Sequence, residues 1–392
     1  PRDGPTETAL QASTQRPTAL PKDGKWLVCR WIWGGIPAIS HLSMTSEEPN
    51  PRPRPPSSRT LRNHDGAGRS KQPITYSQRM STGPGTLLLL DSASLYFRAF
   101  YGVPDERADP QDPPTNAVRG FLDMIATLVE RYRPSHVVAC WDDDWRPAWR
   151  VAAIPTYKTH RVAVVDGGTA VEDAPADLNT QVPIIIEALA ALGIPRWGAA
   201  HYEADDVIGT LVARAHGTQP VDVVTGDRDL FQLVDDAARI RVLYTARGGV
   251  RDPDLVDQAF LSAKYGVPTG AAYADLAVLR GDSSDGLPGV RGIGEKTGAA
   301  LLERYGTLSG LIAAVDGGDP AIKGAQRTRL EEGRGYLDVA PAVVRVAADV
   351  PLPPDVPPLP QHPVDPSALD RLARTYRITG PVSRVTAALA SR

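Results

Sequence analysis

The sequence predicts an α/β fold, in which a mostly parallel central sheet is flanked by helices and followed by a smaller helical domain. Three short apolar runs predict buried strands, at Leu87–Asp91, Val137–Asp142 and Val221–Asp227. Helical patterns lie between them, at Val118–Arg131, Leu178–Leu192 and Ala204–Ala215. Strands that alternate with helices are typical of a parallel sheet covered on both faces.

Length and composition limit the class of protein. The chain has 392 residues, of which 42% are hydrophobic, so it can form two domains with sizeable cores. Its two cysteines do not predict a disulfide scaffold, and Cys140 lies in an apolar run where a buried thiol is expected. No apolar run approaches the roughly 20 residues that span a bilayer. We therefore expect a cytoplasmic protein without a membrane partner.

Residues 1–84 differ in character from the rest of the chain. They contain the proline-rich run Pro51–Pro56 and carry twelve Lys and Arg against six Asp and Glu. This composition predicts a disordered, basic extension. The whole chain has a net charge of −3, so without the +6 of this extension the remainder carries −9. An acidic body is unusual for a protein that binds nucleic acid, unless bound cations neutralise part of the charge.

Each of the three predicted strands ends in an aspartate, at Asp91, Asp142 and Asp227. Ligands of an open parallel sheet bind beyond the carboxyl ends of its strands, so these carboxylates are expected to converge. Any one of them could instead cap a helix, with about even odds. Three in the same structural position favour a shared site.

A polar motif before the helical pattern at Ala204 adds three acids. Glu203 and Asp206 are three residues apart and are predicted to share a helix face, with Asp205 pointing aside. An acidic first turn also suits the helix dipole. Three acids in four residues exceed that need, which favours metal binding.

Further acids follow the third strand and a later turn. Metal binding is favoured for Asp227, whereas capping and metal binding stay equally open for Asp229. A carboxylate cluster repels itself unless hard divalent cations such as Mg²⁺ or Mn²⁺ neutralise it, and such ions usually indicate phosphate chemistry. The nine candidate metal ligands are Asp91, Asp142, Glu203, Asp205, Asp206, Asp227, Asp229, Asp282 and Asp285.

A glycine-spaced turn at Gly289–Gly294 leads into a predicted helix at Glu295–Tyr305. Free backbone N–H groups at the start of this helix, with Lys296 beside them, suit a phosphate. A glycine-rich turn alone is weak evidence, and no strand precedes it, so a dinucleotide site is not predicted. With the following helix, the turn predicts a helix-hairpin-helix element that binds a DNA backbone without reading bases.

Cations and aromatic residues gather in Tyr157–Arg161, on a predicted loop that also contains Arg146 and Arg150. Such a segment suits a phosphate chain with stacked bases. A solvated basic surface is the alternative, and His160 by itself is more often a surface residue than a catalyst.

Together these motifs resemble the flap endonuclease family, and specifically stand-alone bacterial 5'-3' exonucleases similar to the N-terminal domain of DNA polymerase I. The resemblance covers about residues 86–335 and implies a PIN-like or resolvase-like nuclease core. It is carried by an ordered set of motifs, at Leu89–Asp91, Tyr96–Phe100, Asp142, Tyr157–Arg161, Glu203–Asp206, Thr225–Asp229 and Gly281–Asp285.

The resemblance implies a domain organisation. The metal-dependent nuclease core would occupy residues 85–250, with an arch segment at about 145–178. A helix-hairpin-helix DNA-binding domain would follow at 251–335. A C-terminal tail would occupy 336–392, with a short helical pattern at Ser367–Tyr376.

The resemblance also implies roles for single residues. The nine acids would hold two or more Mg²⁺ or Mn²⁺ ions, the hairpin could hold K⁺, and Asp142, Lys158 and Arg161 would be catalytic. Asp91, Asp142, Glu203 and Asp205 are candidates for the tighter metal site, with Asp206 or Asp227 bridging to the other. The implied DNA-binding residues are Arg98, Arg150, Lys158, Arg161, Gly289, Gly292, Gly294, Lys296 and Thr297.

The chain departs from the family pattern at several positions. Trp141 replaces the usual Phe, and Asp143–Trp145 replaces a small or glycine-rich turn. His160 and Gly286 stand where Asn is common. No carboxylate is lost, so activity is not put in doubt, but the geometry of the arch and the metal preference could differ.

The implied activity is that of a structure-specific 5'-3' exonuclease or 5' flap endonuclease, which hydrolyses DNA by a two-metal mechanism and leaves 5' phosphates. Its place would be in replication, where it removes the primers of Okazaki fragments, and in repair. A monomer acting on 5' flaps, nicked or gapped duplex and 5' ends is expected. The alternatives are an RNA-cleaving PIN-like nuclease, which would lack the hairpin, and a non-catalytic DNA-binding scaffold, which would lack carboxylates.

Overall fold

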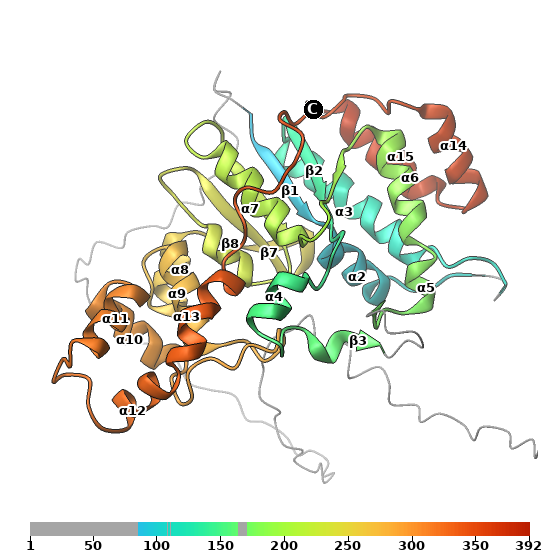
Figure 1. Cartoon of the computed structure of the whole chain (residues 1–392). Helices are drawn as coiled ribbons and strands as arrows, with labels where there is room; N and C mark the ends of the chain where they lie inside the picture. Colours follow the sequence, from blue (N-terminus) through green and yellow to red (C-terminus); the bar gives the residue numbers. More distant parts are fainter. Residues whose placement is uncertain (1–84, 108, 110, 164–170) are drawn as a thin grey trace, which may run out of the picture.

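The computed structural model describes residues 85–392, except 108, 110 and 164–170 (Figure 1). The predicted disorder of residues 1–84 therefore lies outside the described residues. The predicted fold class is confirmed, because a mostly parallel sheet with helices on both faces is followed by a helical domain. No helix among the described residues is long and apolar enough to cross a membrane.

The central sheet has six strands in the order β5-β2-β1-β6-β7-β8. All neighbours are parallel except β7 and β8. Leu90 of β1 lies opposite Ala139 of β2 and Val224 of β6, so the carboxyl ends of these three strands share one edge. The strands are β1 (Leu87–Asp91), β2 (His136–Cys140), β5 (Arg196–Trp197), β6 (Val221–Thr225), β7 (Ile240–Gly248) and β8 (Asp252–Val256).

The side chains of β1 alternate between two hydrophobic cores, one on each face of the sheet. Leu87 and Leu89 pack into the core that contains α7 (Ala204–Ala215), whereas Leu88 and Leu90 pack into the core that contains α3 (Asn116–Tyr132) and α6 (Val182–Leu192). A strand buried on both faces is expected to be apolar, as the four leucines of this one are. Asp91 is the last residue of β1 and therefore lies at the carboxyl edge of the sheet.

The predicted helices agree closely with the structure. The pattern at Ala204–Ala215 coincides with α7, and that at Glu295–Tyr305 coincides with α10 (Glu295–Tyr305). The pattern at 178–192 is interrupted, since α5 (Ala176–Asn179) ends before α6 begins. Cys140 is a buried free thiol, as expected.

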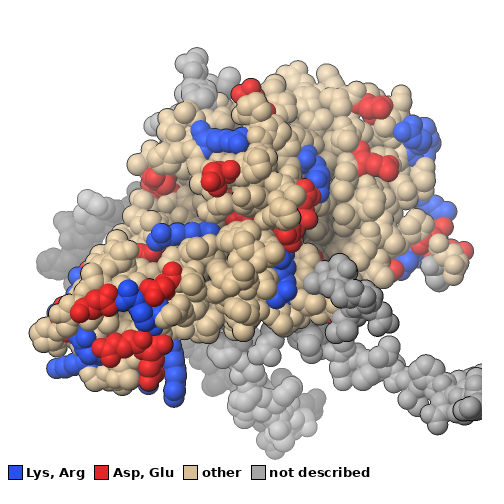
Figure 2. Space-filling model, in the orientation of Figure 1, with Lys and Arg blue, Asp and Glu red and all other residues tan. Residues whose placement is uncertain are grey.

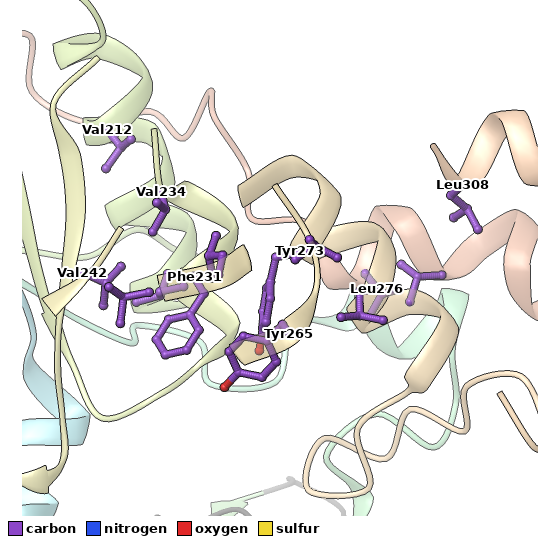
Figure 3. Close-up of a cluster of buried hydrophobic side chains, with 14 of the residues drawn as sticks. Val212, Phe231, Val234, Val242, Tyr265, Tyr273, Leu276 and Leu308 are labelled. Atoms are coloured by element: carbon purple, nitrogen blue, oxygen red, sulfur yellow. The ribbon is translucent and has the colours of Figure 1, made fainter. Parts of the chain in front are cut away.

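The helical domain is continuous with the core of the sheet. Figure 3 shows Val242 of β7 and Phe231 on one side of the cluster, with Tyr265, Tyr273 and Leu276 extending it into the helices. Burial of these apolar groups stabilises the contact between the two parts. The helices are α8 (Gln258–Tyr265), α9 (Gly270–Arg280), α10, α11 (Leu308–Asp316), α12 (Gly324–Glu332) and α13 (Arg334–Val344).

The segment expected as a tail, 336–392, is folded: it begins within α13 (Arg334–Val344) of the helical domain, and the residues after α13 pack onto the sheet domain. After α13 the chain runs back along it, where the Leu359 N–H donates to the Ser135 carbonyl at 2.8 Å. It then forms α14 (Pro366–Thr375), which packs against α6, and α15 (Thr379–Ala390), which packs against α3. The C-terminal helices therefore complete one face of the sheet domain (Figure 1).

Short elements surround the open edge of the sheet. The arch segment begins with α4 (Ala148–Ala153) and the 3₁₀ helix η1 (Thr159–Arg161), and it continues through β3 (Val162–Ala163) and β4 (Val171–Glu172), which pair antiparallel. The remaining elements are α2 (Ser92–Gly102), η2 (Asp229–Leu233) and η3 (Gly249–Arg251).

Candidate active site

A cavity of about 630 Å³ opens at the carboxyl edge of β1, β2 and β6. Its position is the one predicted from the strand-end aspartates. Six of the nine predicted acids line it: Asp91, Asp142, Glu203, Asp205, Asp227 and Asp282. Asp206, Asp229 and Asp285 do not.

Asp91 both caps a helix and lines the cavity. Its Oδ1 accepts a hydrogen bond from the Ser94 N–H at 3.2 Å, at the start of α2. Its Oδ2 accepts one from the Thr225 hydroxyl at 2.6 Å, across the β1–β6 pair. Asp91 therefore caps a helix and also contributes to the site. The sequence pattern alone presented these two roles as alternatives.

Asp142 joins the end of β2 to the start of α7. Its Oδ1 accepts a hydrogen bond from the Ala204 N–H at 2.9 Å. This bond brings the acidic first turn of α7 to the cavity, where Glu203 and Asp205 lie beside Asp142. A strand end and a helix start therefore build one wall of the site.

The structure corrects the prediction about the two aspartates of α7. Asp205 lines the cavity, whereas Asp206 is fully buried away from it. Asp206 forms a capping box with Glu203, accepting from the Glu203 N–H at 3.1 Å. Because the third residue of a helix can fold back onto the cap in this way, its carboxylate points into the protein.

Arg150 binds Asp206 in a bidentate pair, with bonds of 2.7 and 2.6 Å from its two terminal nitrogens. Its Nε donates to the Val343 carbonyl at 3.2 Å, and the Ala347 N–H donates to Asp206 at 2.8 Å. Arg150 is only 2% exposed. We therefore propose structural roles for Asp206 and Arg150, in place of metal binding and DNA binding, because they pair with each other and neither lines the cavity.

Burial and like charge shift the pKa values of the cavity acids. Burial raises the pKa of Asp91 to about 7, and Asp142 adds to the effect. Burial likewise raises the pKa of Glu203 to about 7, and that of Asp205 well above its usual range, with Asp91 contributing repulsion. Such shifts mean that the folded protein disfavours several charges in one place, and a bound cation would relieve this repulsion.

The other predicted acids are arranged around the first group. The Asp229 N–H donates to Asp227 at 2.9 Å, and burial followed by repulsion from Asp227 raises the pKa of Asp229 well above its usual range. Asp282 accepts a 2.6 Å bond from Arg228, and Asp285 accepts a 2.7 Å bond from Arg161. Asp282 in the cavity wall and Asp285 beside it are therefore partly neutralised by protein cations.

Lys158 and Arg161 line the cavity opposite the strand ends, as does His160. The Lys158 Nζ lies 3.0 Å from Glu203 Oε1. Burial alone would lower the pKa of Lys158, but Glu203 raises it well above its usual range, so the ammonium stays charged. Arg98, predicted to contact DNA, is partly buried and donates to the Ala246 carbonyl at 3.3 Å, outside the cavity lining.

Several lining residues were not predicted from the sequence. Glu172 and Asp173 come from β4 and the residue after it, and burial raises the pKa of Glu172. Two-residue strands give no periodic signal, so nothing in the sequence pointed to them. Phe97 and Tyr101 of α2 could have been predicted together, because residues four apart on a helix share a face and α2 begins at the strand-end Asp91.

The hairpin lies between α9 and α10, as predicted. Gly289 and Gly292 have φ values of +64° and +72°, which L side chains rarely adopt, so glycine is required at both turns. Gly294 precedes α10 and no side chain caps that helix. Lys296 is exposed on its first turn. Figure 2 shows that acidic and basic side chains are interspersed over the visible face of the helical domain.

The donor set of the cavity fits hard divalent cations. It offers carboxylate oxygens from several elements and no thiol, and such oxygens are the ligands that Mg²⁺ and Mn²⁺ prefer. In residues 85–392, leaving aside 108, 110 and 164–170, no group of three or more His, Cys, Asp or Glu side chains is placed so that it could hold a metal ion.

Family models match most of the described chain. The model of the 5'-3' exonuclease N-terminal resolvase-like domain matches residues 86–266. The model of the 5'-3' exonuclease C-terminal SAM fold matches residues 268–367. The boundary between them lies just before α9, at the start of the hairpin unit.

Curated relatives support the same assignment. A 5'-3' exonuclease of Streptomyces coelicolor is 57% identical over 303 residues, which are 77% of this chain and 99% of the relative. A 5'-3' exonuclease of Bacillus subtilis is 35% identical over 269 residues, 68% of this chain and 84% of the relative. A DNA polymerase I of Mycobacterium leprae is 41% identical over 246 residues, 62% of this chain but 25% of that protein.

Solved structures share the fold at low sequence identity. The T5 D15 protein co-crystallised with metal ions has a TM-score of 0.50 and 16% identity, and the match covers 78% of this chain and 98% of that one. Human GEN1 in complex with Holliday junction DNA has a TM-score of 0.52 and 18% identity, over 78% and 72% of the two chains. These matches support the architecture.

Proposed function

The chain belongs to the 5'-3' exonuclease family, and from this premise we propose that it hydrolyses DNA from 5' ends and at 5' flaps, leaving 5' phosphates. One observation carries the proposal. Carboxylates from three strand ends and the α7 turn line a single cavity, and Lys158 and Arg161 line the same cavity from the arch segment. This is an acid-and-cation arrangement suited to a phosphodiester.

The acids of the cavity supply the ligands for the reaction. Asp91, Asp142, Asp205, Asp227 and Glu203 would hold two divalent ions, Mg²⁺ or Mn²⁺. Ions held there would activate a water molecule for attack and offset the negative charge that develops on the leaving oxygen. Asp142 and Asp91 are held at the cavity by hydrogen bonds to α7, α2 and β6.

The cations of the arch position the substrate. The Lys158 ammonium is retained at neutral pH by Glu203, and Arg161 is held by Asp285 at 2.7 Å. Both can bind the scissile phosphate and stabilise the negative charge that develops on it. No histidine or cysteine nucleophile is required for this chemistry.

The hairpin would hold the duplex next to the cut site. Its backbone N–H groups and Lys296 are suited to a phosphate, and carbonyl oxygens of its turns to K⁺. These contacts read no bases, so the specificity would be for DNA structure. We propose a cytoplasmic monomer that acts on flaps, nicks and gaps in replication and repair.

The test is cleavage of a 5'-labelled flap duplex during titration with Mg²⁺ and with Mn²⁺. Metal-dependent release of the short labelled flap, ending in a 3' hydroxyl, is expected, and the strand that stays in the duplex should carry the new 5' phosphate. Single-stranded RNA of the same sequence is the control that addresses the alternative nuclease class. Preferential cleavage of RNA would refute the DNA assignment, and binding without cleavage at any metal concentration would favour a scaffold.

A further inference from the structure

The arch segment is bonded directly to the loop that precedes the hairpin. The Lys158 N–H donates to the Asp285 carbonyl at 3.0 Å, and the Thr156 hydroxyl donates to the Gly286 carbonyl at 2.7 Å. We call these four residues, Thr156, Lys158, Asp285 and Gly286, the clasp. They bring together segments that are 130 residues apart in the sequence.

The clasp requires a glycine at position 286. A Cβ atom there would lie 2.0 Å from the Thr156 carbonyl oxygen, a distance that no real side chain could keep. Gly286 also has a φ of +71°, but asparagine tolerates that conformation. Close approach of the arch, and not backbone conformation alone, therefore accounts for the glycine at this position.

The clasp holds the two cations that the arch segment contributes to the cavity, Lys158 and Arg161. Lys158 has a φ of +48°, a conformation that a non-glycine residue keeps only where its surroundings impose it. In that conformation its Nζ lies 3.0 Å from Glu203. From the same segment, Arg161 donates to Asp285 Oδ1 at 2.7 Å and to the Ser284 carbonyl at 3.3 Å.

We propose that Gly286 and Thr156 are positioning residues for the cleavage reaction. Through the clasp they place Lys158 and Arg161 against the carboxylates of the cavity. Asp285 and Gly286 of the clasp are followed directly by the hairpin at Gly289. A duplex bound to the hairpin would therefore be held at a fixed position relative to Lys158 and Arg161. This inference rests on the proposed function, since it assigns the clasp a part in that reaction.

The test compares Gly286→Asn with Gly318→Asn. Gly318 also has a positive φ, of +73°, but a Cβ atom there meets nothing within 4 Å, so it controls for backbone strain. Displacing catalytic groups by about 1 Å costs on the order of 100-fold in rate. We expect that loss in kcat on a 5' flap for Gly286→Asn, with the Kd for the flap in metal-free buffer unchanged within about twofold. Gly318→Asn should behave as wild type.

A second readout does not depend on activity. Hydrogen exchange of the peptide that contains Thr156 and Lys158, followed by mass spectrometry, should be faster in Gly286→Asn and unchanged in Gly318→Asn, because the Lys158 N–H loses its acceptor. Thr156→Val keeps the shape but removes one hydrogen bond, so kcat should fall about fivefold. This milder variant carries the test if Gly286→Asn does not fold.

The outcomes separate the clasp from the proposed function. Wild-type kcat in both Gly286→Asn and Thr156→Val, with unchanged exchange at Lys158, would overturn the clasp while leaving the nuclease intact. If the affinity of Gly286→Asn for the flap fell by the same factor as its kcat, Gly286 would have a general structural role and no specific positioning role. If the wild-type protein cleaved no DNA, the proposed function would fail, and the exchange readout alone would still decide whether the clasp exists.

Discussion

Replacing Arg150 by Met should destabilise the protein strongly while leaving its contacts with DNA unchanged. Arg150 is 2% exposed and Asp206 is fully buried, so the substitution leaves a carboxylate without its countercharge inside the core. The methionine keeps much of the apolar volume and cannot form an ion pair. The substitution therefore mainly measures the effect of removing the positive charge that faces Asp206.

The size of the effect follows from the contacts. Arg150 makes two short bonds to Asp206 and one to the Val343 carbonyl, and its Nη1 lies 3.3 Å from Glu203. Breaking a buried pair on one side costs about 3 to 5 kcal/mol. In a folded unit of this size, that corresponds to a decrease in Tm of about 5 to 8 °C.

The assay is denaturant unfolding of the wild-type and variant proteins, together with flap binding at several salt concentrations. Arg196→Met is the matched control, because Arg196 pairs with Asp143 at the surface. Removing an exposed pair should cost less than about 1 kcal/mol. Asp206→Asn combined with Arg150→Met should be far from additive, since the two residues share one interaction.

The opposite pattern would refute this assignment. If Arg150→Met lost less than about 1 kcal/mol of stability, the uncompensated-charge argument would fail. If it also reduced the slope of log affinity against log salt by about one, Arg150 would be a phosphate contact after all.

Three further predictions concern the cavity and the hairpin. Asp142→Asn should abolish Mg²⁺-dependent cleavage with flap binding largely intact, and full cleavage would refute its role at the site. Lys296→Ala should weaken duplex binding and lower its salt dependence, and an unchanged salt slope would count against the phosphate contact. Burial raises the pKa of Asp91 and of Glu203 to about 7, from ordinary values near 4. The folded metal-free protein therefore binds protons that the unfolded chain releases, so its free energy of unfolding should fall by about 2 kcal/mol or more between pH 4 and pH 8. Unfolding in chelator should show this fall, and added Mg²⁺ should restore more stability at pH 8 than at pH 5; stability that rises with pH would contradict the raised pKa values.

Local patterns were sufficient to predict the framework of the site. The apolar runs at Leu87–Asp91 and Val221–Asp227 and the helical pattern at Ala204–Ala215 correspond to β1, β6 and α7. Strand-end aspartates could be expected to converge because parallel strands end at one edge of a sheet. The hairpin was also predictable, since its glycines and the helix after it are local in sequence.

The orientation of individual acids was not predictable from these patterns. Asp205 and Asp206 are neighbours on one helix, and helical spacing alone favoured Asp206 as the partner of Glu203 at the site. The buried guanidinium of Arg150, 56 residues earlier in the chain, binds Asp206 instead. A carboxylate turns towards the strongest available partner, and that partner was supplied by a distant segment.

By itself, the sequence determined the fold class, the strand ends that carry the carboxylates and the hairpin, because these depend on periodicity and on residues three or four apart. Only the tertiary structure decided which carboxylates face the cavity, that Glu172 joins them, and that the C-terminal helices close one face of the sheet. It also brought Gly286 against Thr156. Those features depend on contacts between segments far apart in the chain, whose geometry is set when both hydrophobic cores pack.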